Sequence, residues 1–174
     1  MRIFAALELP DRVIEKITDW QKPLVSRYPL LNWVRSDAMH LTLRFFGDIP
    51  ESVVQNIHEI LSSWHPGPLE FSLFRIDTFG KKRSPSVFWL GGSMPEEISR
   101  LADELGRVPD EMGKKSGKRF VPHLTVARRG RSSGIPKLNP PEEIKGVFSE
   151  AVVINSKLTS HGPEYTFLER YDLH

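Results

Sequence analysis

The chain has 174 residues, with 24 lysines and arginines against 22 aspartates and glutamates, six histidines and no cysteine. Its 39% apolar and 26% charged residues are typical of a globular protein and exclude a disordered or fibrous one. Without cysteine there is no disulfide, no cysteine-ligated zinc and no thiol nucleophile, which fits a reducing compartment. No apolar run approaches the roughly 18 residues of a membrane span, and Glu8 interrupts the apolar start of the chain. We therefore expect a cytoplasmic monomer without a membrane segment, folded as one domain over residues 1–174.

The predicted elements follow from apolar periodicity and from turn residues. In chain order they are a strand at 2–8, a helix at 11–24, strands at 31–35 and 39–46, a helix at 51–64, strands at 69–76 and 86–91, a helix at 96–108, and strands at 119–127, 147–155 and 164–172. The last two strands are joined by residues 160–163 and are expected to pair antiparallel. Loops are expected at 80–86, 109–118 and 128–142. Because strands outnumber helices and do not alternate with them one for one, the pattern favours an α+β fold.

Basic residues are concentrated in one segment. Residues 112–141 contain no acid and eight bases, which leaves sixteen bases against 22 acids in the rest of the chain. The eight are Lys114, Lys115, Lys118, Arg119, Arg128, Arg129, Arg131 and Lys137. Such a segment suits a polyanionic partner with phosphate groups, and the plain alternative is a solvated basic loop.

One tripeptide occurs twice. His40-Leu41-Thr42 and His123-Leu124-Thr125 both lie in predicted strands. Because side chains alternate along a strand, the histidine and the threonine of each copy share one face and the leucine takes the other. A buried imidazole or hydroxyl needs a polar partner, so both faces are expected to point toward something polar. If two similar lobes pack together, the two faces meet across one central cleft.

Two imidazoles and two hydroxyls in one cleft suit displacement at phosphorus. Histidine titrates near neutrality, so one imidazole can act as general base and the other as general acid. The threonine hydroxyls can donate hydrogen bonds to developing negative charge. Two alternatives remain open: ordinary packing of His-x-Thr in a strand, and a zinc site, which the poor ligand threonine and the lack of a nearby carboxylate disfavour. His58, His65, His161 and His174 have no comparable surroundings.

Through the paired His-x-Thr motifs and the residues that flank them, the chain resembles the 2H phosphoesterase superfamily, in its branch of RNA 2′,3′-cyclic phosphodiesterases, also called 2′–5′ RNA ligases. The segments that carry the resemblance cover most of the chain. They are MRIFAAL at 1–7, NWV at 32–34, HLTLRFFG at 40–47, VFWLG at 87–91 and RFVPHLTVAR at 119–128, with Ser156, Leu158, Gly162 and Tyr165 near the end.

The resemblance implies a bilobal fold, two pseudo-symmetric lobes of antiparallel strands with outer helices around a central cleft, and chemistry without a metal or other cofactor. It implies hydrolysis of a terminal 2′,3′-cyclic phosphate of RNA to a 2′-phosphate. His123 would activate water, His40 would protonate the departing 3′ oxygen, and Thr42 and Thr125 would hold the phosphoryl oxygens. The reverse reaction would exchange the roles of the two histidines, and the resemblance also implies reversible 2′–5′ RNA ligation.

Four further residues are candidates for substrate binding. The resemblance suggests Arg128 at the phosphate and either Phe45 or Phe46 against the terminal base. Arg119, just before the second motif, is a candidate for contacts with the RNA backbone. Strict alternation would place the residue five after each histidine on the opposite face and so favours Phe46, unless a bulge re-aims the strand. Three arginines, Arg128, Arg129 and Arg131, lie close together after the second motif, which leaves open which of them contacts phosphate.

Two other functions compete with this one. One is a phosphodiesterase of the same superfamily that acts on small nucleotide cyclic phosphates. The other is an RNA-binding module that keeps the cleft without turnover.

Overall fold

The computed structural model describes residues 1–81, 83–117, 119–130, 135–160 and 162–173. Its elements in chain order are β1 (Arg2–Glu8), α1 (Asp11–Arg27), β2 (Leu31–Trp33), a short 3₁₀ helix (Ser36–Ala38), β3 (His40–Asp48), α2 (Glu51–Ser62), β4 (Leu69–Lys81), β5 (Ser84–Ser93), α3 (Glu96–Leu105), β6 (Leu124–Arg129), β7 (Ile144–Phe148), β8 (Glu150–Thr159) and β9 (Gly162–Asp172). Helices α1, α2 and α3 lie where the periodicity predicts them.

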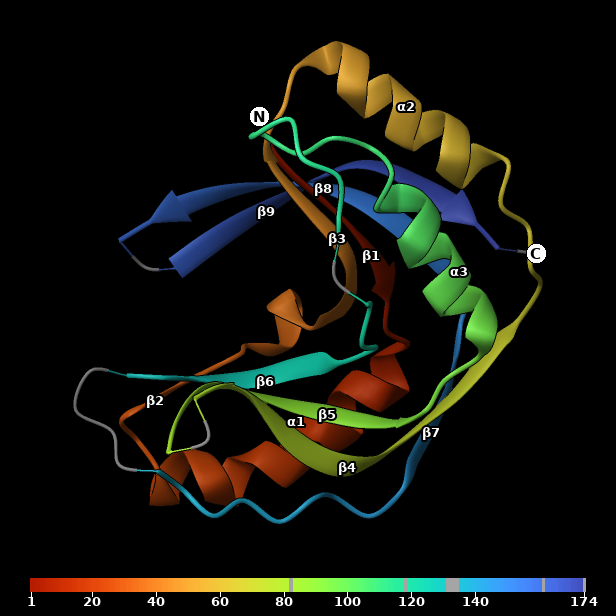
Figure 1. Cartoon of the computed structure of the whole chain (residues 1–174). Helices are drawn as coiled ribbons and strands as arrows, with labels where there is room; N and C mark the ends of the chain where they lie inside the picture. Colours follow the sequence, from red (N-terminus) through yellow and green to blue (C-terminus); the bar gives the residue numbers. More distant parts are fainter. Residues whose placement is uncertain (82, 118, 131–134, 161, 174) are drawn as a thin grey trace.

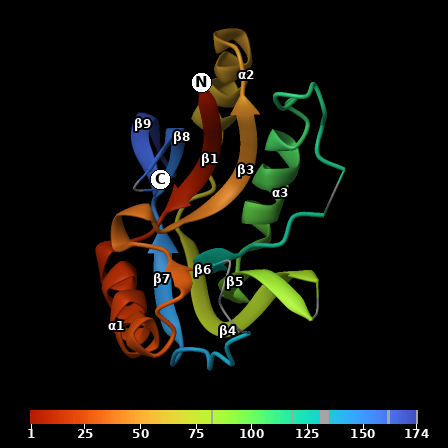
Figure 2. The same cartoon turned by 90° about the vertical axis from the view of Figure 1, so that its left-hand side faces the viewer.

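The strands form two antiparallel sheets, which make two lobes (Figure 1). One has four strands in the order β3-β1-β8-β9, and the other has five in the order β2-β6-β5-β4-β7. In Figure 2 the four-stranded sheet is seen with α2 and α3 beside it, while α1 lies against the five-stranded sheet. The predicted α+β fold with two lobes is confirmed, although the lobes differ in their numbers of strands and helices.

The hydrophobic core continues from one sheet to the other. It includes Leu7 and Leu41 of the four-stranded sheet, Leu90 and Leu124 of the five-stranded sheet, and Ile17 of α1. A second, smaller cluster covers the opposite face of the four-stranded sheet, where Phe4, Ala6, Val152 and Ile154 pack with Tyr165. The four-stranded sheet therefore has one face in the main core and one face turned toward the other lobe.

The strand predictions hold except at three places. The predicted strand at 147–155 is two strands, β7 and β8, which belong to different sheets. The segment 119–123 is not a strand, because Pro122 lacks the N–H that a ladder needs. The predicted loop at 80–86 is largely paired, since Gly80 and Lys81 of β4 lie opposite Pro85 and Ser84 of β5. The pairing of β8 with β9 is confirmed, with Thr159 opposite Gly162.

The predicted loop at 109–118 is attached to the edge of β3. The backbone N–H of Glu111 donates to the carbonyl of Phe46, and its carboxylate accepts from the N–H of Asp48, both over 2.8 Å. The guanidinium of Arg44 donates to the carbonyl of Lys114 over 3.2 Å. This turn therefore covers the free edge of the sheet.

Within the described ranges, no helix is long and apolar enough to cross a membrane.

Candidate active site

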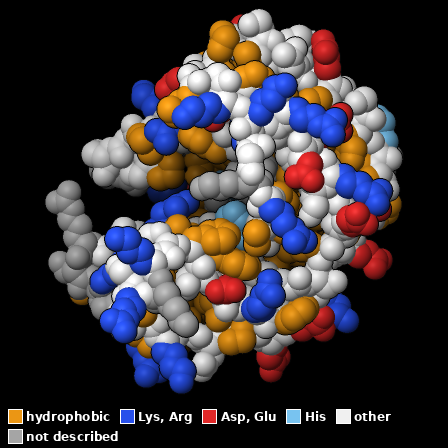
Figure 3. Space-filling model, in the orientation of Figure 1, with side chains coloured by type: hydrophobic (Ala, Val, Ile, Leu, Met, Phe, Trp, Pro, Cys, Tyr) orange, Lys and Arg blue, Asp and Glu red, His pale blue; other side chains and the backbone are white. Residues whose placement is uncertain are grey.

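The two His-x-Thr segments meet between the lobes. Strand β3 lies at the edge of its sheet and contacts β6 of the other. His40, Thr42, Thr125 and Arg128 line one cavity of about 680 Å³ between them. Thr42 also lines an adjoining cavity of about 350 Å³, which contains His123. The space-filling view shows the hollow between the lobes, with histidine atoms inside it (Figure 3). We call the larger of the two spaces the catalytic cavity.

A bulge at the same position in both strands sets which residues face the cleft. Directly opposed residues of antiparallel strands share a face. Thr42 lies opposite Ala6 and Phe45 opposite Phe4, with a register shift between the two pairs. In the other lobe Thr125 lies opposite Trp89 and Arg128 opposite Val87, again with a shift between the two pairs. One extra residue reverses the alternation, so the residue five after each histidine returns to the histidine's face.

Because of this bulge, Phe46 does not lie on the face of His40, so the prediction from strict alternation was wrong. Its side chain is fully buried in the main core and cannot contact a substrate. Phe45 is 44% exposed, stacks beside Phe4 at 6.5 Å between ring centroids, and lines the cavity that contains His123. Arg119 lines that cavity as well.

The same bulge distinguishes the neighbouring arginines. Arg128 faces the catalytic cavity, and among the described residues no carboxylate forms an ion pair with it. Arg129, the next residue on the strand, donates to the hydroxyl of Ser84 instead. Arg131 and Lys118 lie outside the described residues.

The two imidazoles are held in similar ways. The ring of His123 donates through Nδ1 to the carbonyl of Val121 over 2.8 Å, which leaves Nε2 as the proton acceptor. The ring of His40 is hydrogen-bonded to the backbone of Ala38, also two residues earlier. Each ring packs against two aromatic side chains. The distances between ring centroids are 4.8 Å from His40 to Phe4, 5.5 Å from His40 to Tyr165, 4.8 Å from His123 to Phe79 and 5.9 Å from His123 to Trp89.

Burial and charge lower the pKa of both histidines. For His40, burial is the largest cause and lowers the pKa to about 4; the bond to Ala38 opposes it, and the positive charges of Arg128 and His123 lower it further. Burial also lowers the pKa of His123, with a further contribution from Arg128. Both rings are therefore neutral at neutral pH. A bound phosphate would compensate the nearby positive charges and favour protonation of one ring.

This arrangement suits acid–base chemistry on an anion. A neutral imidazole can remove a proton, and a protonated one can return it to a leaving oxygen. The hydroxyls of Thr42 and Thr125 can donate to non-bridging oxygens, and Arg128 supplies a positive charge. Within the described part of the chain, no group of three or more histidine, aspartate or glutamate side chains could hold a metal ion.

Sequence reasoning missed several residues of the catalytic cavity. Tyr165, Trp33, Asn32 and Arg35 also line it. All but Arg35 belong to segments that carry the family resemblance, so those segments were the available signal.

The other histidines lie away from this cavity or outside the described residues. His58 lies on α2, where its Nδ1 is 2.8 Å from the hydroxyl of Tyr171, and His65 lies in the loop after α2. His161 and His174 lie outside the described residues.

Solved structures share this architecture over nearly the whole chain. A Thermus thermophilus protein matches with a TM-score of 0.79 at 26% identity, covering 99% of this chain and 98% of that one. The structure of Escherichia coli LigT complexed with 3′-AMP matches with a TM-score of 0.80 at 23% identity, covering 99% and 97%. This chain therefore has the fold of these proteins, with the duplicated His-x-Thr motif between its two lobes.

The family follows from the sequence comparisons. The model of the 2′-5′ RNA ligase superfamily matches residues 9–149. A protein of Methanothermobacter thermautotrophicus, named RNA 2′,3′-cyclic phosphodiesterase, is 31% identical and covers 99% of both chains. A Thermotoga maritima protein of the same name is 34% identical over 74% of this chain and 70% of its own. This chain belongs to the 2′-5′ RNA ligase superfamily.

Proposed function

We propose that this protein is an RNA 2′,3′-cyclic phosphodiesterase, which hydrolyses a terminal 2′,3′-cyclic phosphate to a 2′-phosphate. The observation that carries the proposal is the convergence of His40, Thr42, His123 and Thr125 on adjoining cavities beside Arg128. The names of the relatives support the choice of substrate.

In the proposed mechanism His123 acts as the base. Its Nε2 accepts a proton from water, and the water oxygen attacks phosphorus in line with the departing 3′ oxygen. His40, which takes up a proton when the negatively charged phosphate binds, delivers this proton to O3′ as the P–O3′ bond breaks, so the product carries a 2′-phosphate and a free 3′-hydroxyl. Thr42, Thr125 and Arg128 hold the non-bridging oxygens as negative charge develops on them.

Two residues next to His123 extend the proposed substrate contacts. Phe45 and Arg119 line the cavity on that side, where an aromatic ring and a guanidinium can contact the bases and phosphates of single-stranded RNA. With a 5′-hydroxyl in the position of the water, the same attack on the cyclic phosphate would give 2′–5′ ligation, with O3′ again as the leaving group. The proposal also includes action as a cytoplasmic monomer and folding of residues 1–174 as a single domain, which the continuous core supports.

The test uses an oligonucleotide that ends in a 2′,3′-cyclic phosphate. We expect His40→Ala and His123→Ala each to lose hydrolysis while the circular dichroism spectrum and the unfolding midpoint stay close to those of the parent, and we expect activity to persist in EDTA. Full activity in either variant would contradict the two-histidine mechanism. Loss of activity in EDTA would favour a metal enzyme, and salt-dependent binding without product would favour an RNA-binding module.

The same assay with a mononucleotide separates the remaining alternative. Faster turnover of the oligonucleotide than of nucleoside 2′,3′-cyclic phosphates supports RNA as the substrate. Equal or faster turnover of the mononucleotides would identify a small-nucleotide phosphodiesterase.

A further inference from the structure

A glutamine interrupts the apolar face of α1. Val13, Ile17 and Gln21 are four residues apart, so their side chains lie in a row on one face of the helix, and all three are buried. Among the described residues, Gln21 is the only buried amide side chain. A carboxamide taken out of water without a partner destabilises a fold, so a glutamine at this position needs hydrogen-bond partners.

The partners of Gln21 are two backbone carbonyls of the five-stranded sheet and its margin. Its Nε2 donates to the carbonyl of Val126 in β6 over 3.1 Å and to that of Val34, just after β2, over 3.5 Å. The backbone N–H of Val34 donates to the same Val126 carbonyl over 2.9 Å. Carbonyls accept and cannot donate, so only the NH₂ group of the amide fits against them. Gln21 thus connects α1 to both strands.

Val126 is the extra residue of the bulge in β6. Ala127 and Thr125 lie opposite consecutive residues of β5, so Val126 between them has no opposed residue there. The side chains of Val126 and Ala127 are both fully buried in the main core, although strict alternation would turn one of them away. The carbonyl that Gln21 holds therefore belongs to the residue that reverses the alternation.

The bulge decides which arginine faces the catalytic cavity. Because of it, Arg128 lies on the same face as Thr125, and both line the cavity. A strand without the extra residue would turn Arg129 toward the cavity and Arg128 toward the core. Asn32 of β2 lies directly opposite Arg128 and lines the same cavity. Both strands that meet α1 at this point therefore carry a lining residue.

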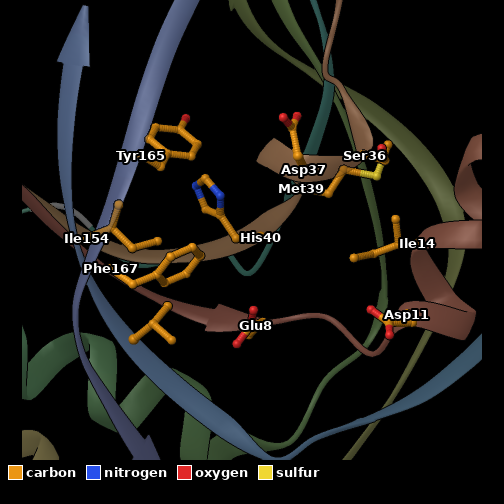
Figure 4. A pocket seen from close by; sticks show the side chains of 11 residues that line it. Glu8, Asp11, Ile14, Ser36, Asp37, Met39, His40, Ile154, Tyr165 and Phe167 are labelled. Carbon is orange, nitrogen blue, oxygen red and sulfur yellow. The ribbon is translucent and has the colours of Figure 1, made fainter.

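Gln21 is set back from the space where a substrate would bind. It is 5% exposed and is not among the residues that line the catalytic cavity or the adjoining cavity with His123. Nearer its start, α1 faces a further cavity of about 370 Å³, which has Asp11 and Ile14 on the side of the helix and His40 across from them (Figure 4). The helix therefore acts on the site through the strands that it holds.

We propose that Gln21 is a positioning residue, which fixes the bulge in β6 and so keeps Arg128 directed into the catalytic cavity. The inference rests on the proposed function for the role of Arg128 as the residue that binds the anion. Without the amide, the buried carbonyl of Val126 loses a donor, and the bulged strand is less favoured over other conformations. Arg128 would then face the cavity for a smaller fraction of the time, and the affinity for an anion would fall.

The test replaces Gln21 by methionine, which has a similar length and no hydrogen-bond donor. The charge of Arg128 lowers the pKa of His40 and of His123, so both pKa values report where the guanidinium lies. In NMR titrations, Gln21→Met should raise both pKa values, in the same direction as Arg128→Ala. The dissociation constant of inorganic phosphate, measured from the same resonances, should rise about tenfold, as expected for one weakened hydrogen bond to a charged group.

Two controls separate positioning from stability. Ile17→Val, on the same face of α1, removes a methylene group and no hydrogen bond, so it should lower the unfolding midpoint and keep the parent's pKa values and phosphate affinity. The double variant Gln21→Met/Arg128→Ala should have the pKa values of Arg128→Ala alone, because no guanidinium is left to position. If Gln21→Met does not fold, Gln21→Asn takes its place with the same expectations, since its shorter side chain cannot reach both carbonyls.

The outcomes separate this inference from the proposed function, because none of these measurements needs turnover. Parent pKa values and parent phosphate affinity in the folded variant at position 21 would overturn the inference, as would a further rise of the pKa values in the double variant. A parent protein that hydrolyses no cyclic phosphate, while Gln21→Met shows the expected changes in pKa and phosphate affinity, would overturn the proposed function alone.

Discussion

Acid should destabilise this protein through His40 by an amount that follows from its surroundings. Burial lowers the pKa of His40 from 6.5 to about 4 in the folded chain. Between these two pH values the unfolded chain holds a proton at this site and the folded chain does not, so falling pH favours unfolding. The stabilisation is fully present above pH 6.5 and is lost as pH falls toward 4. At pH 4.5 the loss from His40 is about 2–3 kcal/mol, since one pKa unit corresponds to about 1.4 kcal/mol.

The assay is urea unfolding at pH 7.5 and 4.5. The parent should lose about 2–3 kcal/mol more of its free energy of unfolding between these pH values than His40→Gln does. His65→Gln, an exposed position in the loop after α2, should behave like the parent. An equal loss in the parent and His40→Gln would refute the reasoning, as would a pKa near 6.5 for His40 in an NMR titration.

Three other predictions use single substitutions. Arg128→Ala should raise the pKa of both catalytic-site histidines, because the guanidinium charge lowers both; unchanged NMR titration curves would contradict this. Gly47→Ala should lower the free energy of unfolding by about 1–2 kcal/mol or more, because φ is +75° at that residue and the new Cβ would meet the carboxylate of Glu111. Urea unfolding with no change would count against that contact. Phe46→Ala should cost about 3–5 kcal/mol by the same assay. Phe45→Ala should cost about 1 kcal/mol or less, since partly exposed side chains contribute little, and equal costs would show that the bulge is misassigned.

Most of the fold could be predicted because its signals are local. Helices α1, α2 and α3 follow from apolar spacing, and the hairpin of β8 and β9 follows from the turn at 160–163. The division between β7 and β8 was missed because only Ser149 separates the two strands, and only their partner strands show that they belong to two sheets. Which strands pair depends on contacts between distant segments, which local periodicity does not contain.

The residues of the candidate site could likewise be predicted only in part from the sequence. His40, Thr42, His123 and Thr125 were found because the tripeptide is repeated. The orientation of Phe45 and Arg128 could not be derived, because one bulge residue in each strand reverses the alternation and leaves no sequence mark.

The central claim is that both histidines act in one reaction at one phosphate. Single-turnover hydrolysis of the cyclic-phosphate oligonucleotide by His40→Ala, His123→Ala and the double variant tests this claim most directly. Residues that act as a unit have strongly non-additive effects, so the double variant should be about as slow as either single variant, each reduced about 10³-fold or more. Losses that multiply in the double variant, or a single variant that keeps the parent rate, would contradict the account.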